Sequence, residues 1–206
     1  MTAVVQASRA GSGERGRLAF ATPADWFAVR LPAERVDAER IASELAAARP
    51  ELAGGQDALA GLLGSLVEAC AALNVLCGYA TLVDTPDGPL PATLVVSVRD
   101  MGGRTLDEIA AGLSAADGSA GPAVTRVFDL PPGRTLRIER RREWPGTAGG
   151  RSLTSMIVQY VAEVPGTGQA VLLVFSTSAA ALAGQLRPVF HQITCTLRFD
   201  RGESAA

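Results

Sequence analysis

The chain has 206 residues, of which 48% are hydrophobic and 19% are charged, and its formal net charge is −2. This composition is typical of a globular protein and excludes a largely disordered one. All 19 basic residues are arginine and the only histidine is His191. The chain therefore cannot form a lysine Schiff base, supply the lysine of a Walker phosphate loop or build a two-histidine metal site.

These exclusions lead us to expect a protein that is not an enzyme and that uses neither a metal nor a cofactor. A slightly acidic chain has no overall attraction for nucleic acid. The sequence contains no uninterrupted stretch of about 18 apolar residues, so we expect no membrane span. Three cysteines, Cys70, Cys77 and Cys195, without a secretory leader pattern are typical of a reducing compartment. We expect a cytoplasmic protein, and its Arg, Ala and Gly content is typical of the codon usage of a GC-rich genome.

The first part of the chain mixes short strands with two helices. Residues 1–15 are small and polar and are predicted to be a disordered arm. Apolar runs at 17–21 and 26–31 predict a strand pair. A helix is predicted over 38–49 and a longer one from about Asp57 to Leu76, because apolar residues recur there at helical spacing.

The second part is richer in strands. A hairpin is predicted over 78–84 and 92–100, and a capping box at Thr105 begins a helix over 105–116. Four strands follow, at 124–130, 134–143, 152–163 and 170–177. A last helix begins after Thr177 or Ser178, and Pro188 is expected to kink it or divide it in two.

Helices that are separated from runs of paired strands predict an α+β fold. We expect an antiparallel β-sheet of about six to eight strands, a meander in its C-terminal half, packed against α-helices. The expected organisation is one domain over 16–200 and a disordered tail over 201–206.

The strand at 134–143 carries the candidate binding residues. These are Arg137, Arg140, Arg141 and Arg142, with Trp144 next to them. Strand alternation places Arg140 and Arg142 on the face of Leu136 and Ile138, and the other two arginines on the opposite face. Guanidinium groups pair with carboxylates and phosphates, so the cluster predicts a site for an anion or an acidic partner. The alternative is a charged strand face that blocks edge pairing.

His191 and Cys195 lie four residues apart in the last predicted helix. A Cys–His pair at this spacing can activate a thiol. The sequence offers no third group to orient the pair and surrounds it with apolar residues, which favours a packing role and no catalytic residue.

Three segments together resemble the PsbP/DcrB-like α+β family. They are W-x-x-x-x-LP at residues 26–32, VQYVAEVPGTGQAVLLVFST at residues 158–177 and CTLRF at residues 195–199. The resemblance implies a binding module or adaptor that has no shared active site.

We therefore expect a cytoplasmic, non-catalytic interaction or adaptor domain. It would bind a protein partner or form a homodimer through the apolar face of the 57–77 helix or through an exposed sheet edge. The alternative is a binding protein for a small anionic ligand, which Arg140 or Arg142 would hold between sheet and helices. Neither reading involves nucleic acid or a membrane.

Overall fold

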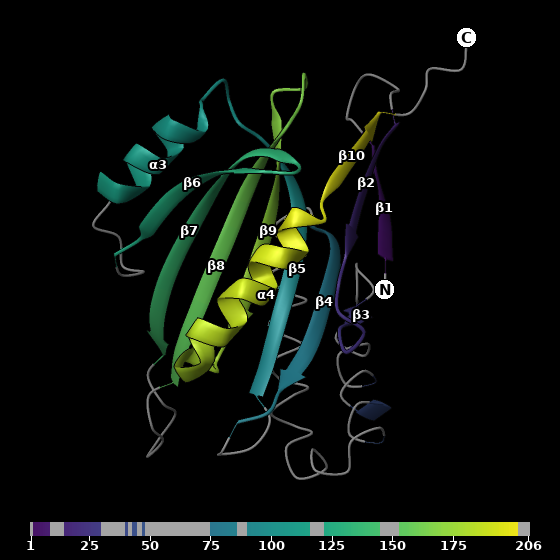
Figure 1. Cartoon of the computed structure of the whole chain (residues 1–206), viewed down its shortest axis with the longest axis vertical. Coiled ribbons are helices and arrows are strands. Elements are labelled where there is room, and N and C mark those ends of the chain that lie inside the picture. The colour runs from purple at the N-terminus through teal and green to yellow at the C-terminus, as the bar shows by residue number, and fades with distance from the viewer. Residues whose placement is uncertain are drawn as a thin grey trace.

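The computed structural model describes residues 2–8, 15–29, 75–85, 90–115, 122–144 and 153–201, and single residues between 40 and 47. Seven strands form one antiparallel sheet in the order β3-β4-β5-β9-β8-β7-β6 (Figure 1). They are β3 (Phe27–Val29), β4 (Val75–Val83), β5 (Leu90–Asp100), β6 (Val124–Leu130), β7 (Gly133–Trp144), β8 (Leu153–Val164) and β9 (Gln169–Thr177). A second sheet, in the order β1-β2-β10, contains β1 (Thr2–Ser8), β2 (Arg15–Ala21) and β10 (Arg198–Arg201). The predicted α+β class is confirmed.

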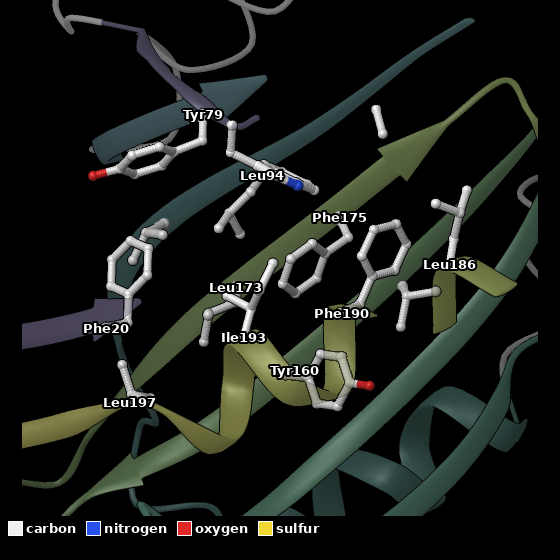
Figure 2. Packing of buried hydrophobic residues seen from close by; sticks show 14 of the residues in the cluster. Phe20, Tyr79, Leu94, Tyr160, Leu173, Phe175, Leu186, Phe190, Ile193 and Leu197 are labelled. Carbon is white, nitrogen blue, oxygen red and sulfur yellow. The ribbon is translucent and has the colours of Figure 1, made fainter. Parts of the chain in front are cut away.

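The main core lies between one face of the large sheet and α4 (Ala183–Cys195), which follows the short 3-10 helix η2 (Ala180–Leu182). Alternate residues of the central strands point toward this helix. Phe175 of β9 stacks on Phe190 of α4 with 4.5 Å between ring centroids (Figure 2). Trp26 contacts both rings edge-on. Phe20 of β2 belongs to the same core, so the small sheet packs against it as well.

A smaller core on the opposite face lies under α3 (Leu106–Ala115). Leu106 is fully buried there with Leu136 and Ile138 of β7. The predicted capping box is present: the Thr105 N–H donates to the Glu108 carboxylate at 2.8 Å, and the Glu108 N–H donates to Thr105 Oγ1 at 3.3 Å. The sheet is therefore covered on both faces near β7.

The N-terminal prediction is wrong in two respects. Thr2–Ser8 is not a disordered arm but a strand, paired with β2 along its whole length. The runs at 17–21 and 26–31 do not pair with each other, because β2 lies in the small sheet and β3 lies beside β4 in the large one. The turn between these runs carries the chain from one sheet to the other.

The end of the long predicted helix is also wrong. Val75, Leu76 and Cys77 begin β4, and Val75 and Cys77 pair with β5 on either side of a bulge. A short apolar run fits helix and strand equally, and the pairing with β5 decides between them. The rest of that prediction, at 57–74, lies outside the described residues.

The prediction for the last helix is partly confirmed. Its first turn is the 3-10 helix, and α4 then continues through Pro188 as one element instead of dividing there. The remaining helix prediction, at 38–49, is described at four exposed positions that are helical. Within the described ranges, no helix is both long enough and apolar enough to cross a membrane.

Candidate functional site

The predicted arginines of β7 divide between the two faces of the sheet. Arg140 lies on the α3 face, and its buried Nε has no hydrogen-bond partner among the described residues. Arg137 lies on the α4 face, directly opposite Tyr160 of β8. Arg141 shares the face of Arg137 and is exposed. The predicted alternation is confirmed. Because each face of the sheet packs against a core of its own, the arginines of β7 do not form one site.

Two of the predicted residues are described through their backbone alone. Arg142 and Trp144 belong to β7 and pair with Ser155 and Leu153 of β8. Their side chains, and the loop that follows Trp144, lie outside the described residues. Their role in binding stays a prediction.

On the α4 face, Arg137 belongs to a group of charged and aromatic side chains between α4 and strands β6 to β8. We call this group the arginine–aromatic cluster. It consists of Arg126, Phe128, Arg137, Glu139, Tyr160, Arg187 and His191.

Phe128 of β6 is the aromatic centre of the cluster. The guanidinium carbon of Arg126 lies 5.2 Å from its ring centroid and that of Arg137 lies 4.8 Å from it. The His191 ring lies 5.5 Å away, centroid to centroid. Arg126 and Arg137 are also directly opposite each other in the β6–β7 register. Like charges in this position destabilise a sheet, and the Phe128 ring offsets part of that cost through cation–π contacts.

Glu139 is the carboxylate of the cluster and joins β7 to α4. Its Oε1 lies 2.9 Å from Arg137 Nε, and its Oε2 lies 3.0 Å from both Nε and Nη2 of Arg187. The side chains of Arg137 and Glu139 are 16% and 15% exposed. A carboxylate buried to this degree is stable only with such partners.

Tyr160 places a hydroxyl at the border between the main core and the cluster. The residue is 0% exposed, and its Oη has no hydrogen-bond partner among the residues that the structure describes. Figure 2 shows this hydroxyl pointing out of the aromatic core. Burial raises the pKa of Tyr160, and the Arg137 guanidinium beside the hydroxyl opposes that rise.

His191 lies against Phe128 and Tyr160, and its buried Nδ1 also has no hydrogen-bond partner in the described part of the chain. Burial and then the Arg137 charge lower the His191 pKa, whereas burial raises the Cys195 pKa. Both shifts oppose the thiolate–imidazolium form of a catalytic pair. The described residues also bring no three His, Cys, Asp or Glu side chains together as metal ligands.

Of the residues in this cluster, Arg137 alone is predicted from the sequence as a binding residue. Phe128, Tyr160 and Arg187 carried no signal of their own, because they meet only through the β6–β7–β8 register and the packing of α4. Strand alternation does place Glu139 on the face of Arg137. Tyr160 lies opposite Arg137 in the β7–β8 register, which depends on the length of the turn between these strands.

No family model matches this chain, and no curated protein matches it. Among solved structures it is similar to LpqN, described as involved in cell envelope biogenesis of Mycobacterium tuberculosis, with 10% sequence identity and a TM-score of 0.48. The alignment covers 96% of this chain and 91% of that one. Similarity at this level carries no argument about function.

Proposed function

We propose that this protein is a non-catalytic binding domain that holds a small anionic ligand at the arginine–aromatic cluster. The observation that carries the proposal is the buried Tyr160 hydroxyl, which finds no acceptor among the described residues and lies beside a guanidinium, that of Arg137, which can only donate. A buried donor without a partner costs about 1–3 kcal/mol. A ligand oxygen that accepts from Tyr160 and faces Arg137 would remove this cost.

The charges of the cluster support the same proposal. Arg126 and Arg137 face each other across β6 and β7, and an anion between them would relieve their repulsion. Guanidinium groups bind carboxylate and phosphate through paired N–H donors. The proposed anion site therefore lies on the face of β7 opposite to Arg140 and Arg142, the residues predicted from the sequence to hold a ligand.

Calorimetric titration of the purified protein with phosphate and carboxylate compounds tests this proposal. We expect Arg137→Gln to weaken binding about tenfold or more, since a hydrogen bond to a charged group contributes roughly 1.5–3 kcal/mol. Arg141→Gln is the matched control, because Arg141 lies on the same face of the same strand but is exposed. Equal effects of the two substitutions would show that binding is a general charge effect and would refute the site.

A second candidate is the predicted protein-binding or self-associating adaptor. The large sheet ends at β6, and none of the described strands pairs with its outer edge. This strand also begins with Val124, which is 66% exposed. Unpaired strand edges bind other strands through their backbone. Light scattering tests the homodimer form: a dimer that dissociates in Val124→Lys would support it, and a monomer at all concentrations would exclude it.

Three further features remain proposals. The 57–77 surface predicted for a partner lies outside the described residues up to 74. The PsbP/DcrB-like kinship rests on the three sequence segments that resemble that family. The cytoplasmic location rests on the odd number of cysteines and is tested by fractionation of the source cells.

A further inference from the structure

We propose that Glu139 is an internal competitor that restricts the arginine–aromatic cluster to dianionic oxyanions, the chemical class of phosphate monoesters. This inference rests on the function proposed above, because it concerns the choice of ligand at the same site. It assigns to Glu139 a role in specificity.

The cluster carries more positive charge than one carboxylate can balance. It contains three guanidiniums and one carboxylate, which gives a net charge of +2: Arg137 and Arg187 pair with Glu139, and Arg126 lies over the Phe128 ring. His191 adds no charge at neutral pH, because burial and Arg137 lower its pKa from 6.5. A bound dianion would neutralise this charge, and a monoanion would leave half of it.

Glu139 already fills the position that a carboxylate ligand would take. Its two oxygens contact two different arginines, Arg137 and Arg187. Its cross-strand neighbours are Val124 on β6 and Val158 on β8, so no other cation of the sheet lies directly beside it. The guanidinium pairs are therefore what holds this carboxylate in a half-buried position.

A free carboxylate must compete with a carboxylate that is attached to the same strand. The attached group has an effective concentration in the millimolar range or above. A monoanion would exchange one such ion pair for another of equal charge and gain little. A phosphate dianion has twice the charge and three oxygens, so it can contact Arg126 and Arg137 and accept from the Tyr160 hydroxyl while Glu139 stays on Arg187.

The test compares two ligands with the same ring, phenyl phosphate and benzoate, by calorimetry at about pH 8, where the phosphate is a dianion. We expect the unsubstituted protein to prefer phenyl phosphate by about tenfold or more, the worth of one hydrogen bond to a charged group. In Glu139→Gln, benzoate binding should tighten by about the same factor, so that the preference narrows. Glu163→Gln is the matched control, since that carboxylate lies on β8 opposite Ala170, on the other face of the sheet.

An unchanged preference in a folded Glu139→Gln protein would overturn the inference but leave the anion site standing. A preference for benzoate in the unsubstituted protein would overturn it without any variant, which covers the case in which Glu139→Gln does not fold. If neither compound binds to any of the proteins, the proposed function itself is wrong. Vesicles with phosphatidic acid, compared with free glycerol phosphate, then assign the phosphate to a lipid headgroup or to a small molecule, and binding of either supports the inference.

Discussion

At the scale of single residues, the buried Tyr160 hydroxyl is the most informative group of the protein. It has no hydrogen-bond partner among the described residues. The Tyr160 ring that carries it contacts the Phe175 ring edge-on. Tyr160→Phe keeps that ring and removes only the oxygen. We expect the free energy of unfolding of the ligand-free protein to stay unchanged or to rise by up to about 1–3 kcal/mol. Urea unfolding measures this, and a clear loss of stability would mean that solvent satisfies the hydroxyl.

His191 gives the protein a predictable dependence on pH. Burial, followed by the Arg137 charge, lowers its pKa in the folded state from 6.5. The unfolded chain therefore binds a proton more readily than the folded one, and stability falls as the pH drops below the unfolded pKa. We expect the urea midpoint to decrease between about pH 7 and pH 5. His191→Gln should flatten that part of the profile, and an equal slope in both proteins would assign it to other groups.

At the scale of elements, α3 is held in place by its first turn. Thr105 and Glu108 exchange hydrogen bonds through their side chains, and Arg134 of β7 binds both oxygens of Asp107 at 2.8 and 2.9 Å. The latter pair is exposed and contributes little, whereas loss of an N-cap costs about 1 kcal/mol. We expect Thr105→Ala to lower the free energy of unfolding by that amount and Thr105→Ser to restore most of it. Amide exchange in α3 should accelerate in the alanine variant alone, and equal exchange would contradict the capping role.

Local signals predicted the elements that local physics decides. The capping box begins α3, and the strands at 124–130 and 170–177 lie within a residue of β6 and β9, because alternation and turn residues mark both ends. The elements that failed depend on distant partners. The sequence of β1 does not by itself predict a strand, which forms by pairing with β2. Val75 belongs to β4 because it pairs with Ser97 of β5. The arginine–aromatic cluster could not be predicted for the same reason, because Arg187 and Glu139, which form an ion pair, are 48 residues apart in the sequence.

At the scale of the whole molecule, the two ends of the described chain meet in one small sheet. β2 pairs with β1 on one side and with β10 on the other, so this sheet is complete only when almost the whole chain is present (Figure 1). Thr196, at the end of α4, connects it to the main core. The Ala21 N–H donates to Thr196 Oγ1 at 2.8 Å, and that hydroxyl lies 2.6 Å from the Ile193 carbonyl oxygen, to which it donates.

Thr196→Val tests whether the hydrogen bond between Ala21 and Thr196 contributes to the stability of the protein. Valine has nearly the shape of threonine, but it leaves the Ala21 N–H without its acceptor, which costs about 1 kcal/mol for a partly buried group such as this one. We expect that loss in urea unfolding, and Thr196→Ser, which keeps the oxygen, should recover most of it. Because the hydrogen bond spans 175 residues, amide exchange should also accelerate in β2 and β10 together. Acceleration in β10 alone would mean that the Thr196 hydrogen bond does not hold β2 in place. The small sheet would then depend on its own strand pairing and on the packing of Phe20 in the main core.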